Sequence, residues 1–317
     1  LIMAYTTINK STDYFDTSLW TGNSTSRLIP LDFEPSFVWG KARSVATQHA
    51  LFDAVRGATG RIKSDTNGAE VPNSGVTAFN SNGFTNGTSD SLNQNGQTFA
   101  SWSWKANGSG SANTDGSINS TVSASTTSGF SIVKYTGTQA TATVGHGLGI
   151  APKMIFFKNV DIADEWLAGV NAGSLDFTQY AYLNLTNAFS GNGAAFFNDT
   201  NPTSSVFSLG NSSNINKSGS SIIAYCFADV QGFSKIGSYI GNGNADGTFV
   251  YTGFKPAFIL IKSATTAMYW HIFDDKRQGF NPNNYRLNPN SSEVETTTTG
   301  VLDFLSNGFK IRTNQQQ

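Results

Sequence analysis

Short stretches in which apolar and polar residues alternate recur along the whole chain, and Gly, Asn, Ser and Thr separate them. In one such stretch, Ala100, Trp102 and Trp104 alternate with serine and so share one face. A period of two predicts β-strands, because successive side chains of a strand point to opposite faces. Helical periodicity is scarce. Residues 46–56 are the best helical candidate, but the counterpart of their first part, residues 267–273, is an aromatic run, so residues 50–55 are predicted as a strand.

The strand pattern occurs in three copies, each of which begins with an aromatic stretch and continues with a proline followed six residues later by a lysine. These prolines are Pro35, Pro152 and Pro256, and the lysines are Lys41, Lys158 and Lys262. Between the first and third copies, a constant offset of 221 residues also pairs Asp53 with Asp274 and Arg56 with Arg277. Repeats of this kind define the architecture and are to be sought before other features.

We therefore predict an all-β protein of tandem antiparallel β-sandwich modules, jelly-roll or lectin-like. Module 1 spans residues 5–105, module 2 spans 129–229 and module 3 spans 230–317. Residues 106–128 are predicted as a Gly/Ser/Asn/Thr-rich linker, with room for a short hairpin. Modules 2 and 3 adjoin directly, so the chain is expected to resemble beads with one loose and one tight joint.

Modules 1 and 2 end in a closing strand, over residues 96–104 and 219–227 respectively. In module 3 this strand would begin at about residue 321, so the third module is predicted to be incomplete. Either the sequence is a truncated one, which we favour, or a neighbouring chain supplies the strand. In both cases module 3 is expected to expose an unpaired strand edge and to be the least stable part.

Composition and charge narrow the possible functions. Charged residues make up 13 % of the chain, and its net charge is −1 with no Lys/Arg block, so nucleic acid is not an expected partner. A single cysteine, Cys226, excludes a framework of intrachain disulfides. The first residues show no secretory signal, and no apolar stretch is long enough to insert into a membrane. This combination indicates a protein assembled in a host cytoplasm and released by lysis.

No motif in the sequence specifies a catalytic reaction, a metal or a cofactor. The glycine-flanked His146 is interpreted as part of a turn. Residues 242–247 begin like a calcium loop, but Gly253 occupies the position where the bidentate Glu is required. The recurring Asp/Arg pairs are interpreted as turn-stabilising ion pairs, and the recurring lysines as strand ends in solvent. We therefore predict no catalytic residue, no metal site and no cofactor.

Aromatic residues close to polar ones provide the candidate ligand site. Sugar rings stack on Trp and Tyr, while Asn, Asp and Ser bind their hydroxyl groups. The predicted ligand-binding residues are Trp166, Tyr269, Trp270, His271, Asp274 and Tyr285. An alternative function is hydrolysis of polysaccharide, which needs two carboxylates facing a cleft. The candidates for that pair are Asp53, Asp164, Glu165, Asp274 and Asp275.

Several short motifs stand out along the chain: residues 20–22 (WTG), 144–149 (VGHGLG), 224–227 (AYCF), 237–243 (GSYIGNG) and 251–258 (YTGFKPAF). Together they resemble a repeat family of marine bacteriophages, whose members resemble tail-fibre or other virion-surface proteins. The resemblance implies a non-enzymatic protein on the virion surface, in contact with other virion proteins and with host-surface glycan. It also allows a trimer, although no sustained heptad is present. A purely structural spacer is the other alternative.

Overall fold

The computed structural model describes residues 5–314, and within them the regular secondary structure consists almost wholly of antiparallel β-strands joined by turns and loops. The all-β prediction is confirmed. The helical elements within these residues are short: η1 (Ser11–Asp13), α1 (Asp90–Asn93), α2 (Gly193–Phe197) and α3 (Ser213–Asn216). Helices α1 and α3 occupy equivalent places in modules 1 and 2, and a serine caps the N-terminus of each.

Module 1 is a sandwich of two sheets. The larger sheet has the order β1 (Phe15–Thr21), β9 (Thr98–Trp104), β3 (Phe37–Ala42), β4 (Ala50–Asp53), β5 (Gly57–Ile62) and β6 (Val71–Pro72). The smaller has the order β2 (Arg27–Pro30), β8 (Gly83–Asn86) and β7 (Val76–Asn80). Alternation along β3 sends Val38 into the core between the two sheets, while Phe37 and Trp39 point out of the opposite face.

Module 2 repeats this plan with more strands. Its main sheet has the order β10 (Ser111–Asn113), β11 (Ser120–Ser125), β12 (Phe130–Thr136), β19 (Ser221–Phe227), β14 (Met154–Asn159), β15 (Leu167–Val170), β16 (Gln179–Tyr182) and β17 (Ser190–Gly191). The second layer is β13 (Ala142–Gly145) with β18 (Val206–Leu209). The hairpin β10–β11 lies within residues 106–128, so the predicted loose linker is wrong: this segment extends the sheet of module 2.

Module 3 lacks some of the strands that modules 1 and 2 share. Its strands form a sheet in the order β20 (Phe249–Tyr251), β25 (Gly308–Ile311), β24 (Thr296–Leu305) and β23 (Asn283–Arg286), and a separate pair, β21 (Phe258–Ile261) with β22 (His271–Asp274). Residues 233–239, the aromatic stretch with which the third copy begins, form no strand. In modules 1 and 2 the opening strands β1 and β12 pair with the closing strands β9 and β19, and module 3 offers no such partner within residues 5–314.

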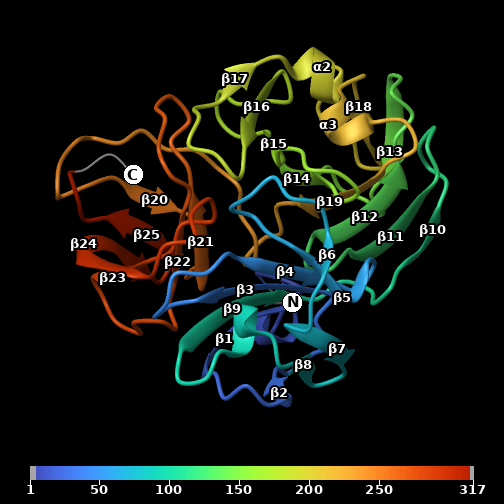
Figure 1. The fold of residues 1–317 in the computed structure, drawn as a ribbon. Helices are drawn as coiled ribbons and strands as arrows, with labels where there is room; N and C mark the ends of the chain where they lie inside the picture. Colours follow the sequence, from blue (N-terminus) through green and yellow to red (C-terminus); the bar gives the residue numbers. More distant parts are fainter. Residues whose placement is uncertain (1–4, 315–317) are drawn as a thin grey trace.

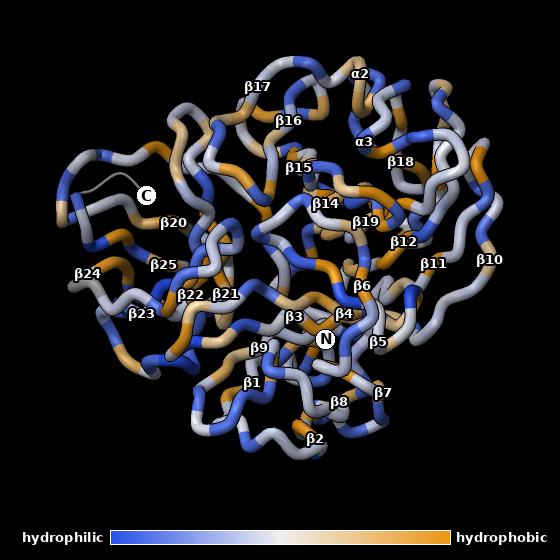
Figure 2. Tube along the Cα trace, in the orientation of Figure 1, coloured by the Kyte–Doolittle hydropathy of each residue, from blue (hydrophilic) through white to orange (hydrophobic). Residues whose placement is uncertain are grey.

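The three modules surround one shared hydrophobic core, so the expected bead-like arrangement is wrong. Figure 1 shows the blue, green-to-yellow and orange-to-red thirds of the chain grouped around a common centre. Each third contributes buried side chains to this core, among them Trp39 and Trp102, Phe156 and Tyr225, and Trp270. Apolar positions are frequent along the strands that face the centre, β3, β14 and β19 (Figure 2). The modules are therefore packed together by their own sheet faces.

Equivalent hydrogen bonds join each module to the next, which gives the chain an approximate threefold arrangement. One set comes from ring nitrogens at matching positions: Trp166 Nε1 to Lys63 O (2.8 Å), Trp270 Nε1 to Tyr182 O (2.9 Å) and His49 Nε2 with Asn288 O (2.9 Å). A second set comes from backbone amides: Glu70 N to Val160 O (2.8 Å), Phe189 N to Ala264 O (3.0 Å) and Glu295 N to Arg43 O (2.9 Å). The interfaces are thus specified by polar as well as apolar contacts.

Candidate functional site

Four of the six predicted ligand-binding residues lie in the interior. Trp166, Trp270, His271 and Asp274 are between 0 and 3 % exposed, so none of them offers a surface on which a sugar could stack. The two tryptophans bond to carbonyl groups of neighbouring modules, and His271 Nδ1 lies 2.8 Å from the side-chain oxygen of Asn288. Trp166 and Trp270 hold neighbouring modules together, and the interpretation of all four residues as a sugar-binding cluster does not fit their burial.

The other two predicted residues are accessible but separate from any described groove. Tyr269 is 41 % exposed. Tyr285 is half-buried, and the guanidinium carbon of Arg43 lies 5.8 Å from the centre of its ring. Neither residue lines one of the two grooves described below. The structure does not bring the six predicted residues together into one site.

The recurring aspartates and arginines form two equivalent buried networks, which confirms their interpretation as ion pairs that stabilise a turn. Arg277 Nε lies 2.5 Å from Asp274 Oδ2, and its Nη1 lies 2.9 Å from Glu295. Arg56 makes the same contacts with Asp53 and Glu70, at 2.6 Å and 2.7 Å. Each aspartate also accepts a hydrogen bond from a closing strand of another module, from Trp102 Nε1 (3.0 Å) or Tyr225 OH (2.6 Å).

Two of the recurring lysines are buried, which contradicts the prediction made for them. Lys41 and Lys158 have no exposed surface, although they were predicted to end their strands in solvent. Lys41 Nζ donates to the carbonyl groups of Ala42 (2.9 Å) and Ser292 (3.3 Å), and the ammonium of Lys158 likewise donates to carbonyl oxygens. Burial lowers the pKa of each of these two lysines to about 8.

The histidines do not present a catalytic base at the surface. All three are buried, and burial is the main cause that lowers the pKa of each one; for His271 the pKa falls to about 4. His146 Nδ1 accepts the amide of Leu148, as expected of a residue that shapes a turn. An imidazole that stays neutral and is enclosed by protein has no route to a substrate proton.

The carboxylates considered for hydrolysis are dispersed. Asp53 and Asp274 belong to the buried ion pairs. Asp164 accepts a hydrogen bond from Asn214, and Glu165 accepts one from Asn184. Asp275 is half-buried, and burial raises its pKa. Each described groove is lined by a single carboxylate, whereas a glycosidase needs two that face its substrate.

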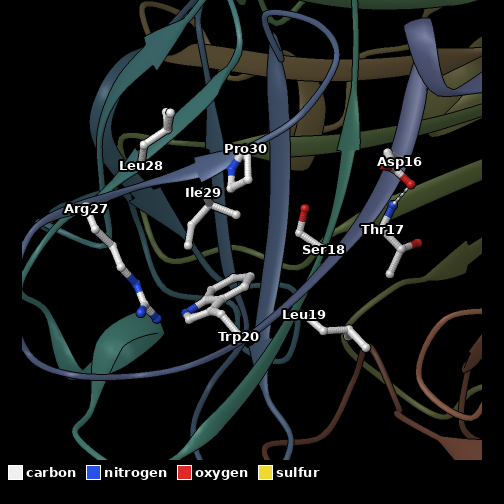
Figure 3. Close-up of a pocket in the computed structure, with 9 residues that line it drawn as sticks. All are labelled: Asp16, Thr17, Ser18, Leu19, Trp20, Arg27, Leu28, Ile29 and Pro30. Atoms are coloured by element: carbon white, nitrogen blue, oxygen red, sulfur yellow. Dashed lines mark hydrogen bonds between the residues drawn. The ribbon is translucent and has the colours of Figure 1, made fainter.

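The first of the two grooves lies in module 1, between β1 of the larger sheet and β2 of the smaller sheet (Figure 3). Its volume is about 390 Å³, and its lining residues are Asp16, Thr17, Ser18, Leu19, Trp20, Arg27, Leu28, Ile29 and Pro30. Trp20 forms its aromatic wall, but the indole stacks on Phe99 at 5.7 Å and its N–H donates to the carbonyl of Leu92. The tryptophan is therefore mainly a part of the sandwich core.

The second groove lies where modules 2 and 3 adjoin and is lined by residues 229–232, 234 and 235, by residues 251–253 at the end of β20, and by Tyr5. Its volume is about 320 Å³. Two tyrosines stand on its rim and are well exposed, Tyr5 at 54 % and Tyr251 at 64 %. Lys235 Nζ and Asp229 Oδ2 pair at 2.6 Å within the same groove. This groove thus combines accessible aromatic faces with charged hydrogen-bonding groups, and we name it the tyrosine groove.

Local geometry positions the two tyrosines. Tyr251 follows Val250 on β20, where alternation turns Val250 toward the core of module 3 and leaves Tyr251 in solvent. Tyr5 donates its hydroxyl to the carbonyl of Gly253 at 3.0 Å. Gly253 has a φ of +85°, and a Cβ atom there would lie 2.6 Å from the Tyr5 hydroxyl oxygen. A glycine at this position therefore serves both the turn and the placement of Tyr5.

The sequence prediction missed the tyrosine groove, because its residues come from three separate segments. The alternation of β20 is the one signal that could have indicated it, since Phe249 and Tyr251 share the face opposite Val250. Nothing in the sequence places Tyr5 beside Gly253, or the Lys235–Asp229 pair beside both. Such proximity follows from the packing of module 3 against module 2 and against the first residues of module 1.

Hydrogen bonds between side chains and backbone amides organise the Asn/Asp-rich loop at residues 242–247. Asn244 and Asp246 bond through their backbone amides to the side chains of Asn242 and Asn244, and the Asp246 carboxylate pairs with Lys310 at 2.5 Å. Within residues 5–314, no group of three or more His, Cys, Asp or Glu side chains is arranged to hold a metal ion. In that same part of the chain, no helix has the length and apolar character needed to cross a membrane.

Comparison with known proteins identifies one family. Residues 10–317 match the model of a domain family described as a domain of unknown function, DUF7483. No curated protein matches the chain, and no solved structure does.

Proposed function

The chain belongs to the DUF7483 family, and we propose that it is a non-enzymatic virion-surface protein that binds host-surface glycan through the tyrosine groove. The observation that carries the binding proposal is the pair of exposed tyrosines, Tyr5 and Tyr251, beside the Lys235–Asp229 ion pair. Aromatic faces stack on the C–H faces of sugar rings, and charged groups bond to their hydroxyls. The likeness of the sequence motifs to phage tail-fibre repeats supports the location.

Two further observations favour binding over the alternatives. The tyrosine groove has one lining carboxylate, Asp229, so the acid and base pair of a glycosidase is not provided by its lining residues. A purely structural spacer would have no need of two exposed tyrosines on the rim of a groove. Two exposed aromatic rings are consistent with weak binding at each site and with avidity from many copies on one particle.

The test is to apply the fluorescently labelled 317-residue chain to an array of bacterial lipopolysaccharides and capsular polysaccharides. The wild-type chain is expected to bind a subset of them. The variants Y251A and Y5A are each expected to weaken that binding by about two- to tenfold, because one aromatic contact contributes about 0.5–1.5 kcal/mol. Both side chains are exposed, so these variants should keep the wild-type unfolding midpoint.

Two more variants provide matched controls. L28A alters the groove on module 1 and should leave binding unchanged. G253A should weaken binding although both tyrosines are retained, because its new methyl group displaces the Tyr5 hydroxyl. The proposal is refuted if the wild-type chain binds none of the glycans, or if Y5A and Y251A bind as the wild type does while L28A does not.

A further inference from the structure

The strand β21 of module 3 has a free edge. In module 1 the equivalent strand β3 is bonded on both sides, to β9 and β4, and in module 2 the strand β14 is bonded to β19 and β15. Within residues 5–314, β21 pairs with β22 alone. Modules 1 and 2 therefore show what normally lies against this edge: an antiparallel closing strand, such as β9 or β19.

The register identifies which backbone groups face the free edge. On the β22 side, the amide of Asp275 donates to the carbonyl of Ala257 at 3.1 Å, as the amide of Ala54 does to Ser36 in module 1 at 2.9 Å. Hydrogen-bonding direction alternates along an antiparallel strand, so Ile259 and Ile261 also bond toward β22. The backbone groups of Phe258 and Leu260 consequently point outward, as Phe37 and Trp39 point toward β9.

Side-chain burial at this edge is incomplete. Phe37 and Trp39 of β3 are only 1 % and 2 % exposed, whereas their equivalents Phe258 and Leu260 are each half-buried. Phe258 already contacts the closing strand of module 1, with its ring 5.4 Å from that of Trp104. An added strand with large apolar side chains at alternate positions would complete the burial on this part of the shared core.

The approximate threefold arrangement also specifies the middle of the added strand. Asp53 faces Tyr225 of the closing strand β19, and Asp274 faces Trp102 of the closing strand β9. In module 2, the residue at the position of these aspartates is Val170, which accepts no hydrogen bond through its side chain. The residue of a third closing strand that takes the place of Tyr225 would face this valine, and so should be apolar with no donor to satisfy.

We propose that the free edge of β21 binds a third closing strand, an antiparallel segment with large apolar side chains at alternate positions and a donor-free residue opposite Val170. Addition of a strand to an open sheet edge is an established mode of peptide recognition, in which backbone hydrogen bonds give affinity and alternate side chains give specificity. The site is distinct from the tyrosine groove and independent of glycan binding.

The test uses the full 317-residue chain with synthetic peptides based on β19, flanked by lysines for solubility. One peptide carries the sequence of residues 221–227 with Y225F, a second keeps the tyrosine, and a third is a scrambled sequence that loses the alternation. Hydrogen exchange is followed by NMR at the amides of Phe258 and Leu260. The Y225F peptide should slow exchange there by about tenfold or more at saturation, while Ile259 and Ile261 are already protected without it.

Peptide preference and an edge variant make the result specific. The Y225F peptide should bind more tightly than the tyrosine peptide, and the scrambled peptide should not bind. L260P removes an outward amide and should abolish binding, while the matched variant L260A, which loses the same side chain but keeps the amide, should retain it. The proposal is refuted if no peptide protects Phe258 and Leu260. It is equally refuted if these amides are protected without peptide, including by dimerisation of the chain through this edge.

Discussion

Arg277→Met is the sharpest test of how the modules are held together. The Arg277 side chain has no exposed surface and pairs with the buried Asp274 at 2.5 Å and with Glu295 at 2.9 Å. Asp274 in turn accepts the Trp102 N–H of module 1. The substitution keeps most of the side-chain volume but leaves a buried carboxylate without its cation, which costs about 3–5 kcal/mol. R277M should lower the free energy of unfolding by that amount.

The measurement is urea unfolding followed by tryptophan fluorescence, which reports on the central core through Trp102 and Trp270. Lys276→Met is the matched control, because Lys276 is the adjacent residue and is exposed. K276M should change the free energy of unfolding by no more than about 0.5 kcal/mol. A cost below about 1 kcal/mol for R277M would refute the view that this ion pair is essential to the buried network in which Asp274 of module 3 accepts the Trp102 N–H of module 1.

Two further predictions follow from buried titratable groups. Lys41 and Lys158 have pKa values of about 8, below the 10.5 of the unfolded chain, so the unfolded state binds more protons between these values. Stability should therefore rise as the pH increases from 8 to 10.5, by up to about 3 kcal/mol per lysine, and the variant K41M should flatten the profile of unfolding midpoint against pH. An equally steep profile in K41M would contradict this assignment. Burial raises the pKa of the Cys226 thiol to about 12. A thiol reagent at pH 8 should therefore label Cys226 only after unfolding. Rapid labelling of the native chain would show that the thiol is accessible and contradict this prediction.

The fold class was predictable because it depends on local signals. Alternation along residues such as Ala100, Trp102 and Trp104 predicted a strand, and β9 is one. Repeated motifs predicted three modules with related strands, and β3, β14 and β21 are equivalent in the structure. Both signals arise from side-chain periodicity and turn chemistry, which act over a few residues and so are visible in one sequence.

The arrangement of the modules and the candidate site were not predictable in the same way. Trp166 and Trp270 belong to an aromatic class that suits either a core or a sugar platform, and their burial depends on contacts with Lys63 and Tyr182 of neighbouring modules. Alternation shows that two residues share a face, but it does not show whether solvent or another module covers that face. The error about the sugar site and the error about the bead-like arrangement therefore have the same origin.

Recurrence between copies marks the interfaces in this protein. The Asp/Arg pair occurs in modules 1 and 3, where the facing closing strand presents a hydrogen-bond donor, Tyr225 or Trp102. In module 2 the corresponding position is Val170. The aspartate is thus found where a buried donor needs an acceptor. The tyrosine groove, in contrast, is formed by non-equivalent residues from all three modules, as expected if recognition evolved at one junction of a scaffold whose repeated residues serve its assembly.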